Sequence, residues 1–408
     1  MRILILTQWY PPEPALLLQE LAQSLQGLDH EVTVLTGFPN YPSGQLYPGY
    51  KIRLRRREVL EGVPVVRVPL YPEHSRSGLR RALNYISFAL SAALLGPWLS
   101  KRPNVIFVYH PPLTVGLPAW VLSRIWRVPF VYQIQDIWPE TLAATGMLNS
   151  PRALNMVGAV ARWVYRKAAA LLVISPGFKE NLVDKGVTES KIHIIPNWAN
   201  IETYRPRLPD LALAEELGMA GKFNVLFAGN IGEAQALDTV VQAATYLTAD
   251  PEVQFVIVGD GTALEDLKQA AIERGLTNMR FLGRRPATEM PSLYALADVL
   301  LVHLRDDPLF RITVPHKIMA YLASGKPILA AVAGDAADVV QQAGAGLTCP
   351  PQQPASLAEA VRVLQTLSPG ERRAMGERAR QAAEGQYGRE ETVRRIEGVL
   401  VSTVSSHV

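Results

Sequence analysis

The segment Arg311-Ile-Thr-Val-Pro-His-Lys317 places basic residues at the start of a predicted helix. Pro315 suits the first turn of that helix and Thr313 suits its cap, and we expect Gly325 to end it. Lys317 then lies in the first turn, where the helix dipole disfavours a cation unless an anion is bound nearby. The segment therefore predicts a diphosphate site, with a solvated surface lysine as the alternative.

A second phosphate-binding signal follows the apolar run Phe223–Ala228. The next residues are Gly229-Asn-Ile-Gly232, and a helix is predicted to begin near Leu237. Glycines at such a position let the backbone approach a ligand, and the unpaired N–H groups of a helix N-terminus favour phosphate. Glycines at strand ends also serve in simple turns, and this alternative stays open.

Polar side chains follow two predicted strands in the first half of the chain. Asp136 and Glu140 come after the strand Phe130–Gln133, and His110 comes after the strand Val105–Tyr109. Ligands of open parallel sheets bind beyond the carboxyl ends of the strands. Asp136 and Glu140 are therefore candidate contacts for a polar ligand, and His110 is a candidate proton acceptor. Helix capping by Asp136 and simple packing of His110 are the alternatives.

The loop after the first predicted strand argues against nicotinamide chemistry. It reads Thr7-Gln-Trp-Tyr-Pro-Pro-Glu-Pro14, without the G-x-G-x-x-G of a dinucleotide-binding turn. The one cysteine, Cys349, excludes a disulfide framework and fits a reducing compartment. Because no signal-peptide pattern precedes the first strand, we expect a cytoplasmic protein.

Length and element pattern predict two α/β domains. A chain of 408 residues exceeds what one hydrophobic core usually supports. Apolar runs alternate with helical segments such as Leu16–Gln26, which is typical of a mostly parallel sheet covered on both faces. The linker-like stretch Asn200–Asp210 interrupts the alternation, which restarts at Phe223–Ala228. The predicted fold is therefore α/β, with two doubly wound, Rossmann-like domains.

Charge and one apolar segment indicate an anionic partner for the first half. Residues 1–200 hold 21 Lys and Arg against 12 Asp and Glu, whereas the whole chain carries a net charge of +4. Membrane headgroups, a lipid diphosphate and nucleic acid fit this excess, and scattered surface charge is the alternative. The apolar segment Leu79–Leu99 contains Pro97 and is short for a membrane span. We expect a helix buried against the sheet, with an interfacial membrane helix as the alternative.

With these residues and further motifs, the chain resembles the family 4 glycosyltransferases, which are retaining enzymes of the GT-B fold. Within that family it is similar to a bacterial exopolysaccharide and O-antigen branch that includes L-fucosamine transferases and colanic-acid-type transferases. The matching motifs are Gln8-Trp-Tyr-Pro-Pro-Glu13, His30-Glu-Val-Thr-Val-Leu-Thr-Gly37, Pro39-Asn-Tyr-Pro-Ser-Gly44, Asp136-Ile-Trp-Pro-Glu140, Ser175-Pro-Gly-Phe178, Ile195-Pro-Asn-Trp198, Ala228-Gly-Asn-Ile-Gly232 and Pro315-His-Lys317 with Gly325-Lys-Pro327.

The resemblance implies transfer of a hexosyl or N-acetylhexosaminyl group in cell-surface polysaccharide synthesis. The donor would be a nucleotide sugar, with a UDP-sugar favoured, and the acceptor a lipid-linked sugar or a glycan. No cofactor, metal or nucleic acid is implied, and a cytoplasmic enzyme at the inner face of the membrane is expected. Lys317, Asp136 and Glu140 would take catalytic roles. Donor-binding residues would be Asn230, Gly232, Gln235, Arg311, Thr313, Val314, Pro315 and His316, and acceptor-side residues Tyr10, Pro12, Glu13 and His110.

The domains implied are residues 1–200 for the acceptor, 201–385 for the nucleotide sugar, and 386–408 for a C-terminal helix that crosses back to the first domain. The family's two glutamates are absent, since their positions hold Ile312 and Ala320. The nucleotide ribose therefore lacks its usual carboxylate partner. The missing pair motivates one alternative, a non-catalytic binding or scaffold subunit of a polysaccharide assembly complex. A nucleotide-sugar epimerase, which shares the GT-B architecture, is a further alternative.

Overall fold

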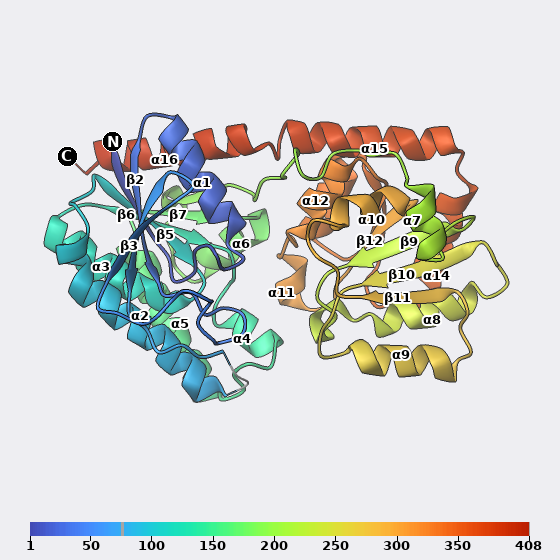
Figure 1. The fold of residues 1–408 in the computed structure, drawn as a ribbon, viewed down its shortest axis with the longest axis horizontal. Coiled ribbons are helices and arrows are strands. Elements are labelled where there is room, and N and C mark those ends of the chain that lie inside the picture. The colour runs from blue at the N-terminus through green and yellow to red at the C-terminus, as the bar shows by residue number, and fades with distance from the viewer. Residues whose placement is uncertain (75–76, 408) are drawn as a thin grey trace. The chain divides into compact units, whose positions relative to one another are not determined.

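The computed structural model describes residues 1–74 and 77–407, which form two compact units. Unit 1 comprises Met1–Ile195 together with the chain from Val393 onward, and unit 2 comprises Pro196–Thr392. Each unit is built on its own sheet with helices around it (Figure 1). Each unit contains the alternation of strands and helices from which two α/β domains were predicted.

Unit 1 contains an eight-stranded sheet in the order β3-β4-β2-β1-β5-β6-β7-β8, and only the β3–β4 pair is antiparallel. Its strands are β1 (Arg2–Leu6), β2 (Glu31–Gly37), β3 (Arg56–Leu60), β4 (Val63–Val68), β5 (Val105–His110), β6 (Phe130–Ile134), β7 (Ala170–Val173) and β8 (Ile192–Ile194). Its helices are α1 (Leu16–Gly27), α2 (Gly78–Leu99), α3 (Gly116–Trp126), α4 (Glu140–Ala144), α5 (Pro151–Lys167), α6 (Pro176–Asp184) and α16 (Arg389–Ser405), with 3-10 turns at Leu113–Val115 and Glu189–Lys191.

The edge strand β3 is the element of this sheet that the sequence did not predict. It pairs with β4 through a two-residue turn, in which Glu61 and Gly62 both have positive φ, so that Leu60 faces Val63. Positive φ at both turn residues is the geometry that a tight hairpin requires. The charged sequence of β3 hides the strand from an apolar-run criterion, and charge is also what protects a sheet edge from aggregation.

The helix α2 covers the unit 1 sheet with only one of its faces. It packs against β2, β4 and α3, and it buries Phe88 and Ala92. Its other face exposes a continuous row of large apolar side chains, and Pro97 lies within the helix rather than interrupting it. The expectation of a helix buried against the sheet therefore holds for one face of α2 and is wrong for the other. The exposed row consists of Leu79, Leu83, Ile86, Leu90, Leu94 and Trp98.

By length and composition alone, α2 is the one helix of the described residues that could cross a membrane. The contacts that α2 makes with the sheet and with α3 make it part of the unit 1 body. On the same face of the sheet α3 packs against α5, whereas α1 covers the opposite face (Figure 1).

The C-terminal helix α16 joins unit 1 from Val393 onward. Two contacts attach it to that unit. The Glu397 carboxylate lies 2.7 Å from Nε2 of His30, and the Arg395 guanidinium donates to the Ile194 carbonyl at 2.6 Å.

Unit 2 contains a six-stranded, fully parallel sheet in the order β11-β10-β9-β12-β13-β14. The central strands are buried along their whole length, as expected for a parallel sheet covered on both faces. Its strands are β9 (Phe223–Ala228), β10 (Val253–Val258), β11 (Met279–Gly283), β12 (Val299–His303), β13 (Ile328–Ala331) and β14 (Gly346–Cys349). Its helices are α7 (Leu211–Glu216), α8 (Asp238–Tyr246), α9 (Leu264–Glu273), α10 (Met290–Leu296), α11 (Pro308–Arg311), α12 (Lys317–Ser324), α13 (Asp335–Gln342), α14 (Pro354–Thr366) and α15 (Pro369–Glu384), with a 3-10 turn at Glu233–Gln235.

Candidate functional site

The carboxyl ends of β9 and β10 form the floor of a site in unit 2. The two strands are neighbours, and each is followed by a glycine, Gly229 after β9 and Gly259 after β10. The Gly229 N–H donates to the Val258 carbonyl at 3.0 Å. A Cβ on Gly259 would lie 1.8 Å from the Gly229 carbonyl oxygen, so only glycine fits there. The backbone of both loops is therefore packed tightly at the edge where ligands of parallel sheets bind.

A pocket of about 610 Å³ lies over these loops, a size that suits a small-molecule ligand. Its walls come from both glycine loops, from the residues after β11, from α10 and from the start of α12. The polar and charged lining residues are Tyr204, Asn230, Asp260, Arg284, Arg285, Tyr294, His316 and Lys317.

Lys317 is the central cation of this pocket. It is the first residue of α12, and its Nζ lies 3.7 Å from the centre of the Phe227 ring, a cation–π contact. Within the described residues it forms no ion pair. Burial lowers the pKa of Lys317 to about 7. A desolvated ammonium at the positive end of a helix is costly unless an anion binds beside it, and the pocket provides room for that anion.

Gly229 makes room for this ammonium. Its φ is +144°, a conformation that favours glycine, and a Cβ at this position would lie 2.7 Å from Nζ of Lys317. The glycine predicted as a phosphate-loop residue thus also leaves space for the Lys317 ammonium.

Gln235 orders the loop that follows β9. Its Oε1 accepts hydrogen bonds from the Asn230 side-chain amide and from the Gly232 N–H, both at 3.2 Å. The Gln235 carbonyl lies 2.7 Å from Nδ1 of His303, whose pKa is lowered to about 4 by burial. Asn230 lines the pocket, whereas Gly232 and Gln235 support the loop from outside its lining.

The start of α12 differs from the prediction. The helix begins at Lys317 with His316 in the cap position, and the Thr313 hydroxyl donates to the Leu309 carbonyl at 2.8 Å. Thr313 therefore does not cap α12, because its hydroxyl is used at the end of α11. Pro315 correspondingly precedes the helix instead of lying in its first turn.

The predicted donor residues do not all reach the pocket. Asn230, His316 and Lys317 line it. Arg311 pairs with Asp306 at 2.9 Å and lines a different surface depression. Those absent from the pocket lining are Gly232, Gln235, Arg311, Thr313, Val314 and Pro315.

Several lining residues were missed by sequence reasoning. Gly259-Asp-Gly261 follows the apolar strand β10 just as Gly229-Asn-Ile-Gly232 follows β9, so the same glycine criterion would have found it. Arg284 and Arg285 follow β11 and carried no comparable signal. Ala320 also lines the pocket, so the position where the resemblance implies a glutamate offers no carboxylate to this pocket.

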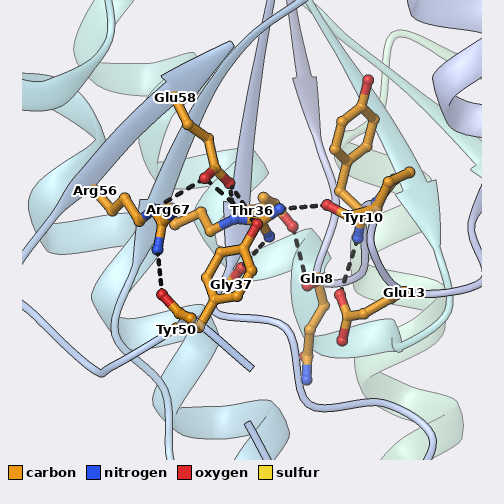
Figure 2. Close-up of polar contacts among 11 residues, drawn as sticks. Gln8, Tyr10, Glu13, Thr36, Gly37, Tyr50, Arg56, Glu58 and Arg67 are labelled. Carbon is orange, nitrogen blue, oxygen red and sulfur yellow. Dashed lines mark hydrogen bonds and ion pairs between the residues drawn. The ribbon is translucent and has the colours of Figure 1, made fainter. Parts of the chain in front are cut away.

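In unit 1, a buried arginine, Arg67, forms a hydrogen bond with the loop after β1. Arg67 donates to the Gly37 carbonyl at 2.8 Å, to the Pro11 carbonyl and to the Glu58 carboxylate at 2.5 Å. Figure 2 shows these contacts together with Tyr10 and Glu13 of the same loop. Tyr10 is fully buried, which places the predicted acceptor-side tyrosine in the core of the loop.

Glu13 joins two loops of unit 1. Its carboxylate accepts N–H groups from Tyr10 at 3.1 Å, from Asn40 at 2.9 Å and from Tyr41 at 2.9 Å. Burial raises its pKa to about 7, against the opposing effect of these three hydrogen bonds. The described contacts thus give Glu13 a supporting position, behind the surface that an acceptor would touch.

Replacing Glu13 by alanine should destabilise unit 1 by about 3 kcal/mol, because two buried N–H groups and one partly buried N–H group lose their acceptor. We expect a lower calorimetric unfolding temperature, while Glu216→Ala, at an exposed site of unit 2, should leave it unchanged. An unchanged unfolding temperature for Glu13→Ala would contradict the supporting role.

The ends of β5 and β6 bring His110, Asp136 and Trp138 together. The His110 ring is fully buried 5.4 Å from the Trp138 ring, and neither of its nitrogens has a partner among the described residues. Burial lowers its pKa to about 3, so the ring is neutral. Asp136 is half-buried and burial raises its pKa to about 6.

The start of α4 settles two details of the Asp136–Glu140 segment. Pro139 occupies the cap position of α4 without a side-chain cap bond, so the alternative that Asp136 caps this helix is wrong. Glu140 forms an ion pair with Lys185 at 2.7 Å, so its carboxylate already has a partner within unit 1.

Two family models match the chain. A glycosyl transferase 4-like domain matches residues 15–198, and a glycosyl transferases group 1 domain matches residues 214–382. The chain is 30% identical to the putative colanic acid biosynthesis glycosyl transferase WcaI of Escherichia coli K12, covering 69% of this chain and 71% of that protein. It is 28% identical to the probable glycosyltransferase WbjE of Pseudomonas aeruginosa, covering 64% of this chain and 66% of that protein.

Solved structures share the fold at low sequence identity. The crystal structure of Anabaena Alr3699/HepE in complex with UDP matches with a TM-score of 0.76 at 19% identity, covering 98% of this chain and 100% of that one. WaaG, a glycosyltransferase involved in lipopolysaccharide biosynthesis, matches with a TM-score of 0.67 at 18% identity, covering 97% and 99%. These matches confirm the predicted GT-B fold of two Rossmann-like domains.

Proposed function

The chain belongs to the family 4 glycosyltransferases, and we propose that it transfers a sugar, with retention, from a nucleotide-sugar donor to a lipid-linked or polysaccharide acceptor. The observation that carries the proposal is Lys317, a desolvated cation that lines the pocket and forms no ion pair within the described residues. The similarity to WcaI, whose name refers to colanic acid biosynthesis, supports a role in cell-surface polysaccharide synthesis.

In this proposal the diphosphate of the donor lies at the N-terminus of α12. Lys317 and the N–H groups of the first turn stabilise the negative charge that develops as the sugar–phosphate bond breaks. Arg284 and Arg285 add positive charge to the same pocket. Protein groups therefore neutralise the leaving diphosphate, and the proposal assigns no role to a metal ion. A UDP-sugar is the favoured donor, in keeping with the UDP bound to the HepE structure.

The acceptor is assigned to unit 1. Asp136 and Glu140 contact sugar hydroxyls, and Asp136 is the better placed of the two because Glu140 is already paired with Lys185. The bond between the sugar C1 and the phosphate oxygen breaks, and C1 forms a new bond to the acceptor hydroxyl oxygen. The hydroxyl proton passes to the leaving phosphate oxygen, so no protein base is needed. The neutral His110 supports Trp138 by ring contact.

Incubation of the purified protein with candidate nucleotide sugars and acceptors, followed by NMR, tests the proposal. A new glycosidic product supports transfer. Conversion of the donor without any acceptor would identify an epimerase instead. If no product forms and no nucleotide binds, the result would favour a scaffold subunit.

The affinity for UDP should fall as the pH rises from 7 to 9. Because burial lowers the pKa of Lys317 to about 7, the unliganded protein loses the charge on this side chain above that pH and must regain a proton to bind the diphosphate. The loss should approach tenfold per pH unit for one coupled proton. Isothermal titration calorimetry across this range measures it, and Lys317→Met should give a flat profile. A flat profile for the native protein would refute the assignment.

We also propose that unit 1 contacts the inner face of the cell membrane. The exposed apolar row of α2 supports this, with Leu94 70% and Trp98 84% exposed. The Arg57 guanidinium donates to the Leu99 carbonyl at 2.9 Å, so the basic segment 51–57 adjoins the end of α2. An apolar helix face flanked by basic residues suits an anionic lipid surface.

The double substitution Leu94→Gln and Trp98→Gln should reduce co-sedimentation with anionic vesicles roughly tenfold or more, because two exposed apolar side chains no longer enter the interface. Ile272→Gln, at a similarly exposed position in unit 2, should leave the bound fraction unchanged. If the native protein stays in the supernatant at low salt, the membrane proposal fails.

A further inference from the structure

An apolar groove of about 380 Å³ crosses unit 1 between α2 and α5. Its volume lies within the range of small-molecule sites. The walls are formed mostly by apolar and aromatic side chains, which offer little to a polar ligand and much to a hydrocarbon. They include Tyr85, Ile86, Trp138, Leu142, Met147 and Met156.

The inner end of the groove adjoins the residues assigned to the acceptor. Trp138 lines the groove, follows Asp136 by two positions and contacts the His110 ring at the end of β5. A molecule lying in the groove would therefore present one end near the carboxyl ends of β5 and β6. Those strand ends are the region where the proposed function places the acceptor sugar.

The outer side of the groove continues the exposed apolar row of α2. Ile86 belongs to both, and on α5 the side chains of Met156 and Val160 line the groove while being 65% and 44% exposed. Arg81 also lines the groove, and it forms no ion pair in the described part of the chain. The groove thus combines a hydrocarbon surface, an opening on the face proposed to meet the membrane, and one cation.

We propose that this groove holds the hydrocarbon chain of a lipid-phosphate acceptor, with Arg81 on the phosphate. The inference rests on the proposed function and adds a second subsite to it. Each methylene that the groove removes from water should raise affinity roughly fourfold. The flexible thioethers of Met147 and Met156 can adapt to an irregular chain. A guanidinium suits a phosphate because it can donate two parallel hydrogen bonds.

Calorimetric titration with farnesyl diphosphate, below its micellar concentration and with saturating UDP present, tests the proposal. Inorganic pyrophosphate serves as the probe without a chain. We expect farnesyl diphosphate to bind at least roughly a hundredfold more tightly than pyrophosphate, because the chain supplies most of the affinity. Equal affinities would overturn the proposal. Titration with UDP alone reports on the proposed function, so the failure of one is distinguishable from the failure of the other.

A groove variant and a matched control locate the binding. Met156→Gln with Val160→Gln should weaken farnesyl diphosphate binding roughly tenfold or more and leave UDP binding unchanged. Since both side chains are partly exposed, the unfolding temperature should not fall. Ile272→Gln should bind like the native protein. Undiminished binding by the groove variant would overturn the proposal. A second outcome would also overturn it: the native protein binds no farnesyl diphosphate, forms a dimer, and the groove variant dissociates that dimer. The groove would then be occupied by a second copy of the chain.

Discussion

Replacing Lys317 by methionine should lower kcat/KM for sugar transfer by about a hundred- to a thousandfold. Removal of one preorganised group that stabilises charge in a transition state typically has an effect of this size. Methionine keeps the length of the side chain and its packing on Phe227, so the loss would report on charge and not on a cavity. Initial rates with the donor and acceptor pair that gives product in the transfer assay measure it. The unfolding temperature should stay the same or rise, because a desolvated cation has been removed.

The matched control is Lys268→Met on α9, where the partly exposed lysine pairs with Glu265. This variant should transfer sugar at the native rate. Native activity in Lys317→Met would remove Lys317 from the mechanism and with it the main support for the diphosphate position.

Substituting alanine for Gly259 should abolish nucleotide binding and destabilise unit 2 by about 3 kcal/mol. The new Cβ would lie 1.8 Å from the Gly229 carbonyl oxygen, and the φ of +144° is one that alanine rarely adopts. The two glycine loops would have to separate, which moves the backbone on which the ligand lies and the space that Lys317 occupies. Titration with UDP and calorimetric unfolding measure the two effects.

Gly275→Ala provides the comparison. Gly275 also has a positive φ, of +63°, but a Cβ at this position would meet no described atom within 4 Å. The conformational strain alone should cost about 1 kcal/mol, with UDP affinity unchanged. If both variants bound UDP like the native protein, the contact between the two glycine loops would not shape the site.

Most strands of both sheets could be predicted from sequence because parallel strands buried on both faces appear as uninterrupted apolar runs. The edge strand β3 could not, since its residues Arg56–Leu60 are largely charged and its pairing depends on the conformation of Glu61 and Gly62. The exposed face of α2 was anticipated only by the alternative of an interfacial helix. An apolar composition does not tell which faces of the helix pack against other elements of the fold.

Those parts of the candidate site that follow from local sequence could be predicted. Residues that reach the pocket from segments distant in the sequence could not. Lys317 follows from helix-start chemistry, although the cap position lies three residues later than Thr313. Arg284 and Tyr204 reach the pocket from other elements of unit 2, and their sequence surroundings are those of an ordinary loop and a linker. Which residues meet at a pocket depends on the order of the strands in the sheet, and a single apolar run in the sequence does not reveal that order.

Titration of the native protein with UDP, GDP and dTDP in turn, repeated with Lys317→Met, tests the donor site of unit 2 most directly. We predict that at least one nucleotide, with UDP favoured, binds at one site per chain and that Lys317→Met weakens that binding at least roughly tenfold. If none of the three nucleotides binds the native protein, the pocket of unit 2 is not a donor site, and the proposed function is contradicted.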